Sequence, residues 1–76
     1  MIWFLERGPE LLVCETRHAS DGRAFELSTV EPAGSERVER FSTPTAMLER
    51  FVEFQRELKK GGWQIVPEER RLRPLI

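Results

Sequence analysis

Turn signals divide the first half of the chain into short segments, and this pattern constrains the fold more than any other feature. The segments between the turns are rich in β-branched, aromatic or alternating residues, and they read "MIWFL", "LLVCETRHA", "AFELSTV" and "RVERF". The stretches that separate them contain Gly, Pro or Asp, and they read "RGPE", "SDGR" and "EPAGSE". Such an order is typical of antiparallel strands joined by short turns. The sequence therefore predicts a four-stranded meander.

The pair Asp21-Gly22 is the strongest hairpin signal, because a two-residue type I′ turn needs positive φ at both positions. Pairing outward from this turn places one set of side chains on a single sheet face, namely Leu12, Cys14, Thr16, His18, Phe25, Leu27 and Thr29. This face is the more apolar one, so we expect it to be buried. The opposite face carries Arg17 across from Glu26, which is a solvated pattern.

The stretch "STPTAMLERFVEFQRELKKGG" predicts a helix over 43–60. Ser42 or Thr43 can cap the free amides, Pro44 suits the first helical position, and Gly61 is expected to supply the left-handed exit. At 100° per residue the apolar side chains gather on one arc, which holds Phe54, Met47, Leu58, Phe51, Gln55, Leu48 and Val52. We expect this arc to lie on the apolar face of the sheet.

Together these segments predict an α+β fold, with an antiparallel sheet of four or five strands and one C-terminal helix packed on one face. A single domain over residues 1–66 accounts for them, and residues 67–76 lack periodicity and are expected to form a disordered tail. Residues 63–66 either add a fifth strand or fold Trp63 back against the helix end. A chain of this length buries only about 60% of its unfolded surface, so its stability margin is thin.

Cys14, His18 and Asp21 lie close together in the sequence and raise the question of a catalytic site. Four residues on a regular strand separate Cys14 from His18 by about 13 Å, whereas a nucleophile and its base must approach to roughly 3 Å. We expect Cys14 to be a buried structural thiol, the alternative being a reactive or metal-binding one, and His18 to be a partly buried packing residue. Asp21 is explained by turn chemistry. No catalytic, cofactor-binding or metal-binding residue is assigned.

Charge and aromatic residues bear on nucleic-acid binding. The formal net charge is −1, so no long-range field draws the chain onto nucleic acid or an anionic membrane. The basic tail of Arg70, Arg71 and Arg73 could still touch phosphates, and either Trp3 or Phe4 could stack single-stranded bases from an exposed sheet face. The polar residues predicted around that aromatic are not those of a basic groove.

Composition also suggests a source and a compartment. A single cysteine cannot form an internal disulfide, and Glu6 and Arg7 interrupt the apolar start, so neither a secretory leader nor a spanning helix is expected. The cytoplasm is the expected location. Arg is preferred over Lys, which suggests a bacterium of high GC content.

The order of "MIWFLER", "ETRHASDGRAFELSTVEP" and "TPTAMLERFVEFQRELKKGGW" resembles that of small uncharacterised bacterial proteins with a four-stranded meander and one C-terminal helix. This resemblance covers residues 1–66 and implies a fold but no activity. The strand and helix order is also similar to the unit of whirly and PUR-type single-strand binders. That second likeness is one of topology.

Two groups of apolar side chains that are expected to be exposed indicate a partner surface. If Gly8-Pro9 is a two-residue connection, the face away from the helix and the rim of the helical arc expose Ile2, Phe4, Val13, Val30, Leu48 and Val52. Such patches usually mark a partner surface, and the commonest partner is a second copy related by a two-fold axis. We therefore expect a small non-enzymatic binding or oligomerisation module, a homodimer or a complex with another protein. The alternative is a single-stranded nucleic-acid-binding domain that uses the open sheet face.

Overall fold

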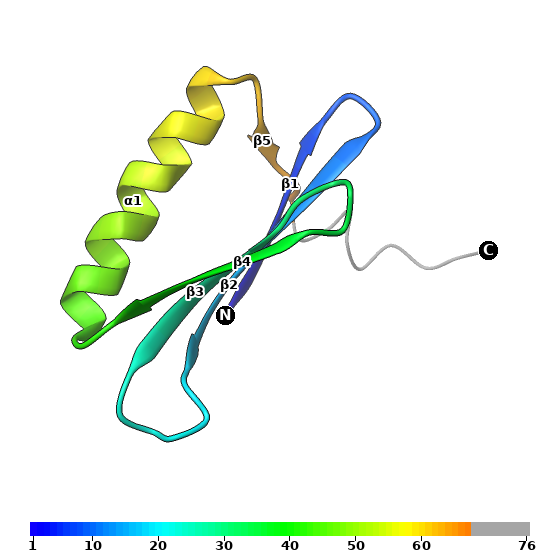
Figure 1. Ribbon diagram of the computed structural model, residues 1–76. Helices are drawn as coiled ribbons and strands as arrows, with labels where there is room; N and C mark the ends of the chain where they lie inside the picture. Colours follow the sequence, from blue (N-terminus) through cyan, green and yellow to red (C-terminus); the bar gives the residue numbers. More distant parts are fainter. Residues whose placement is uncertain (68–76) are drawn as a thin grey trace.

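The structure, a computed structural model, describes residues 1–67 (Figure 1). The antiparallel strands β1 (Ile2–Arg7), β2 (Glu10–His18), β3 (Phe25–Val30) and β4 (Glu36–Phe41) form a meander. Helix α1 (Pro44–Lys60) follows, and β5 (Gln64–Ile65) pairs with β1. The sheet order is β4-β3-β2-β1-β5, which confirms the predicted α+β architecture with a fifth strand. Of the predicted tail over 67–76, all but Pro67 lies outside the described residues.

The first hairpin has the predicted register. Gly8 and Pro9 connect β1 to β2, and Phe4 lies opposite Val13. Gly8 has a φ of 57°, a conformation that glycine adopts without steric cost. Phe4 therefore lies on the sheet face turned away from the helix, and Trp3 lies on the face beneath it.

The second hairpin has the predicted pairing but not the predicted turn. His18 lies opposite Phe25, as expected, and the Ala19 amide donates to the Ala24 carbonyl at 2.8 Å. The type I′ turn is wrong, because Gly22, with a φ of 72°, is the residue there with positive φ. Asp21 instead accepts a 2.9 Å hydrogen bond from the Arg23 amide, so its carboxylate stabilises a wider loop without a left-handed aspartate.

The third hairpin joins β3 to β4 through Pro32, Ala33 and Gly34. The Glu31 amide donates to the Ser35 carbonyl at 2.8 Å, and the Gly34 amide donates to the Glu31 carbonyl at 2.8 Å. Gly34 has a φ of 95°. A turn followed by a left-handed glycine is a common three-residue hairpin loop, and it closes the ladder at Glu31 and Ser35.

Helix α1 ends at Lys60 as predicted, and it begins at Pro44, one residue after the predicted start at 43, with Thr43 as its cap. The Thr43 hydroxyl accepts from the Ala46 amide at 3.2 Å, and Pro44 takes the first helical position. The predicted left-handed exit at Gly61 is wrong, since Gly61 has a φ of −84° and Gly62 has the positive φ of 91°. The Gly61 amide still donates to carbonyls of the last helical turn, so the reversal comes one residue later.

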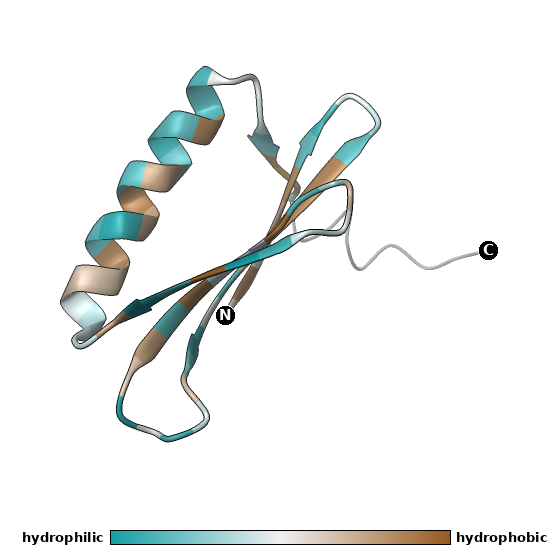
Figure 2. Ribbon diagram, viewed as in Figure 1, coloured by the Kyte–Doolittle hydropathy of each residue, from teal (hydrophilic) through white to brown (hydrophobic). Residues whose placement is uncertain are grey.

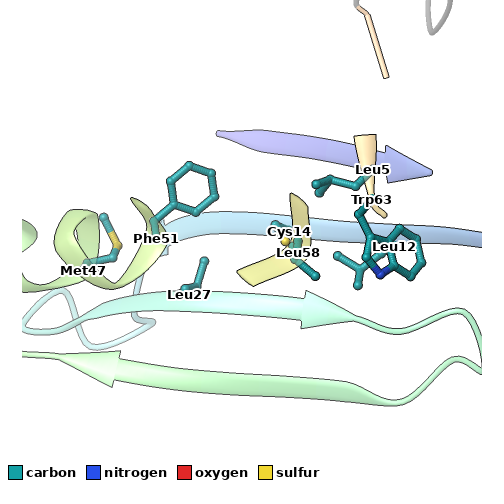
Figure 3. Packing of buried hydrophobic residues seen from close by; sticks show 8 residues of the cluster. All are labelled: Leu5, Leu12, Cys14, Leu27, Met47, Phe51, Leu58 and Trp63. Carbon is teal, nitrogen blue, oxygen red and sulfur yellow. The ribbon is translucent and has the colours of Figure 1, made fainter. Parts of the chain in front are cut away.

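The core lies between α1 and the covered face of the sheet. Its buried members come from the helix, from three strands and from the turn before β5, and they are Leu5, Leu12, Cys14, Leu27, Met47, Phe51, Leu58 and Trp63 (Figure 3). The ring centroids of Trp3 and Phe51 are 4.1 Å apart, which joins β1 to the middle of the helix. Trp63 is buried and β5 also forms, so both expectations for residues 63–66 are met.

The sheet therefore has two unlike faces. Helix α1 lies along one of them with its hydrophobic side inward, as the hydropathy colours show (Figure 2). No described helix or strand covers the other face, which we call the open face. Any surface that this domain offers through its sheet must lie on the open face or along an outer strand.

Candidate functional site

An apolar row crosses the open face. Phe4 of β1 lies opposite Val13 of β2, and Val13 lies opposite Val30 of β3. The Val66 amide donates to the Phe4 carbonyl at 2.8 Å, which brings Val66 alongside as the fourth member. All four are half-buried, because neighbours in the row shield one another. We call Phe4, Val13, Val30 and Val66 the apolar row.

Exposed apolar side chains extend this row along the strands. Ile2 lies two residues before Phe4 on β1, and Leu11 lies two residues before Val13 on β2. Val38 of β4 lies opposite Ser28 of β3. All three are among the exposed large hydrophobic residues of the described chain. The sequence predicted Ile2 and missed Leu11 and Val38, although strand alternation places both on the open face.

The other end of the open face is an ion-pair cluster. Arg17 contacts Glu26 at 3.0 Å and Glu15 at 2.9 Å, and these hydrogen bonds raise the pKa of its guanidinium. Arg40 reaches Glu26 at 3.7 Å and Asp21 at 3.4 Å. The cluster matches the solvated pattern predicted for this face, and as an exposed network it contributes little to stability.

The helix flank formed by Leu48 and Val52 is the second apolar surface. Leu48 is 52% exposed and Val52 is 50% exposed, and with Thr45 and Glu49 they line a shallow hollow. At 100° per residue this flank lies on the side of α1 away from Arg50, whose guanidinium contacts Glu39 of β4 at 3.2 Å. The flank therefore faces away from β4.

The structure separates Cys14, His18 and Asp21 rather than uniting them. Cys14 is buried on the regular strand β2, between Trp3 and Thr29 of the neighbouring strands. His18 packs on Phe25 with ring centroids 4.8 Å apart, but it is exposed, so its expected partial burial is wrong. It lies in the last position of β2, beyond the cover of the helix. Within residues 1–67, no three side chains of His, Cys, Asp or Glu gather as a metal-ligand set.

Cys14 is expected to react slowly with thiol reagents in the native state. Burial raises the pKa of its thiol, and a hydrogen bond with Thr29 offsets the shift only in part. Because the folded pKa lies above the unfolded one, this group's contribution to stability is full below the unfolded pKa and is lost as pH rises through the folded value. Time-resolved labelling by a disulfide reagent, with and without urea, measures the reactivity.

A Leu48→Cys variant provides the matched control for that measurement. The added thiol lies on the exposed helix flank, so one equivalent of reagent should react fast and the second only upon unfolding. Fast reaction of both equivalents in buffer alone would show that Cys14 is accessible.

Two contacts that hold these surfaces in place escaped the sequence analysis. Arg50 joins α1 to Glu39 of β4, and the hydrogen bond from Arg50 to Glu39 raises the pKa of the Arg50 guanidinium. Arg7 donates to the Gly61 carbonyl at 3.1 Å and lies over Trp63 at 4.6 Å from the ring centroid. Each contact links residues far apart in the chain, so no local pattern indicates it.

Comparison with protein-family models, with curated proteins and with solved structures found no significant match. In the described part of the chain, no helix is both long enough and apolar enough to cross a membrane.

Proposed function

We propose that this chain is a small non-enzymatic binding or oligomerisation module that works as a homodimer through the open face of its sheet. The apolar row is the observation that carries the proposal. Four half-buried side chains cross the face side by side, and Ile2 and Leu11 extend them with exposed apolar surface. In a domain with a thin stability margin, a continuous apolar patch usually marks a partner surface.

The charges around the apolar row favour a protein partner over nucleic acid. Arg17 and Arg40 are the basic residues of the open face on β2 and β4, and both are already engaged by carboxylates. Single-strand binders combine aromatic side chains with a positively charged groove. Of the two candidate stacking aromatics, Trp3 packs against Phe51 under the helix, and Phe4 lies on the open face among valines rather than in a basic groove.

The chemistry of the remaining side chains supports a non-enzymatic role. The one cysteine is buried and the one histidine lies exposed at the end of β2, packed on Phe25. Among residues 1–67, the thiol of Cys14 has a hydrogen bond with Thr29, and the imidazole of His18 lies against the ring of Phe25. A lone buried thiol also fits a reducing compartment, and we propose the cytoplasm.

Phe4→Glu is expected to abolish association through the open face. It places a charge in the middle of the apolar row, where a partner would have to bury it unpaired, and this should weaken a homodimer by at least about 100-fold. Sedimentation equilibrium over a hundredfold range of concentration measures the mass.

Val52→Glu on the helix flank is the matched control, because it introduces the same charge on the other apolar surface. The proposal requires that this variant retains the wild-type mass. A dimer that survives Phe4→Glu and is lost with Val52→Glu would move the contact to the helix flank, and a wild-type monomer throughout would remove the proposal.

A further inference from the structure

Strand β4 forms one outer edge of the sheet, and its backbone hydrogen-bonding groups have a defined direction. In an antiparallel ladder, hydrogen-bonded and non-hydrogen-bonded pairs alternate. The hydrogen bond from the Glu31 amide to the Ser35 carbonyl fixes the phase, because this pair continues the β3–β4 register. The amides and carbonyls of Glu36, Val38 and Arg40 therefore point away from β3. We call these groups the β4 edge.

The charge order along β4 is self-complementary. Residues 36–40 read "ERVER". If a second copy pairs antiparallel with Val38 opposite Val38, then Glu36 lies opposite Arg40 and Arg37 lies opposite Glu39. Each of these pairs occurs twice across the two-fold axis, and opposite charges in directly opposed positions stabilise a sheet.

The outward direction of the backbone groups and the sheet face of each side chain both agree with this register. Glu36, Val38 and Arg40 share the open face, and Arg37 and Glu39 share the face under α1. Pairing about Val38 opposes residues of the same face and joins outward amides to outward carbonyls. The same alternation therefore satisfies the side chains and the hydrogen bonds together.

The neighbouring registers lack this match. Shifting the pairing by two residues in one direction opposes Glu39 to Glu39, and shifting it in the other direction opposes Arg37 to Arg37. Like charges directly opposite each other destabilise a sheet. A shift by one residue opposes side chains from different faces. Charge and face thus select one register.

From this agreement we infer that two copies of the chain pair along their β4 edges, about a two-fold axis through Val38, into one continuous sheet. Charged residues usually protect an outer strand from pairing with other chains. Here the order of the charges opposes like charges in most pairings and opposite charges when the partner strand is a second copy of β4. Within the chain Arg37 and Arg40 make long contacts, at 3.4 Å to Glu31 and Asp21 and at 3.7 Å to Glu26, which can be exchanged at little cost. Glu36 accepts from Ser28 at 2.6 Å and Glu39 pairs with Arg50 at 3.2 Å, so these two carboxylates would take the partner's guanidinium as an additional contact.

This inference goes beyond the proposed function, because it uses a different surface and a different chemistry. The apolar row lies on β1, β2, β3 and the residue after β5, and its member Val30 lies opposite Glu36 of β4. The pairing uses the outward backbone groups of β4, whereas the open-face contact uses the side chains of the row. Edge pairing leaves both apolar rows accessible and places the two open faces on the same side of the joined sheet. A contact through β4 and a contact through the apolar row can therefore be tested separately.

Charge reversal tests the pairing directly. An acidic-edge variant carries Arg37→Glu and Arg40→Glu, and a basic-edge variant carries Glu36→Arg and Glu39→Arg. Each variant alone opposes like charges in every flanking pair, so its self-association should weaken by at least about 100-fold. An equimolar mixture restores opposite charges in all four positions and should form a heterodimer by sedimentation equilibrium.

A variant with Arg56→Glu and Lys60→Glu is the matched control for the acidic edge, since it makes the same change of charge on the helix. It should retain the wild-type dimer. Both edge variants are measured in the Phe4→Glu background, which removes the open-face contact. There, dimerisation of either edge variant alone as strong as that of Phe4→Glu itself, or a mixture that stays monomeric while circular dichroism shows both variants folded, would overturn the inference. Loss of the dimer in the edge variants but not in Phe4→Glu would support edge pairing and overturn the open-face contact; the reverse result would do the opposite.

Amide hydrogen exchange of the wild-type chain gives an independent readout that needs no variant. The amides of Glu36, Val38 and Arg40 should exchange more slowly as the concentration rises, because each becomes a donor to the second copy. Exchange rates at these three amides that do not change over a hundredfold range of concentration would contradict the pairing, whatever the edge variants do.

Discussion

Phe51→Ala is expected to lower the free energy of unfolding by about 3–5 kcal/mol. Phe51 lies in the middle of the buried side of α1, and its ring packs against Trp3 at a centroid distance of 4.1 Å. Truncation removes apolar contacts and leaves a cavity between the helix and β1. A core of this size rarely supplies more than about 3–5 kcal/mol in total, so the variant should be largely unfolded at room temperature.

Urea titration followed by circular dichroism measures this loss, with Val52→Ala as the control. Val52 is the next residue on the same helix, but its side chain is 50% exposed. Its truncation should change the unfolding free energy by no more than about 0.5 kcal/mol. Equal midpoints for the two variants would mean that α1 packs on the sheet through a different side.

Leu27→Ala is expected to cost about 2–5 kcal/mol, the second large loss of stability. Leu27 is 0% exposed in the central part of β3, under the helix. The neighbouring strands hold it on both sides, with Thr16 opposite on β2 and Glu39 opposite on β4. The sheet cannot easily collapse around a smaller side chain there, so the cavity term should be near its full size.

Leu48→Ala makes the same chemical change at a side chain that is 52% exposed. Both variants should be compared in urea at the lowest practical concentration, so that association does not add to the measured stability. We expect the midpoint of Leu27→Ala to fall far below that of Leu48→Ala. Similar midpoints would contradict the assignment of Leu27 to the core.

The two surfaces differ in how far the sequence revealed them. Alternation and the Gly8-Pro9 turn placed Phe4, Val13 and Val30 on the open face, and the structure has this register. The same alternation could have identified Val38. The β4 edge was only partly visible in the sequence. The predicted meander places "ERVER" on an outer strand, but "ERVER" matters only if the outer side of that strand is unoccupied, and the sequence did not tell which edge a fifth strand would cover.

The conformations of two turns could not be predicted from the local sequence alone. Asp21-Gly22 correctly set the pairing of β2 with β3, but the loop is wider than a type I′ turn. Gly61 and Gly62 are both permissive residues, and the chain reverses at the second. The guanidinium of Arg7 lies over Trp63 and donates to the Gly61 carbonyl, which holds the helix exit in place.

The sequence by itself determined the first four strands, the helix, and the faces of the side chains around the Asp21-Gly22 hairpin, because these depend on residues within a few positions of one another. The tertiary structure decided that β5 covers part of β1 while β4 stays at the edge, that His18 is exposed, and that Arg50 bridges to Glu39. Each of these depends on segments far apart in the chain, whose distances are fixed only when the sheet and helix pack together.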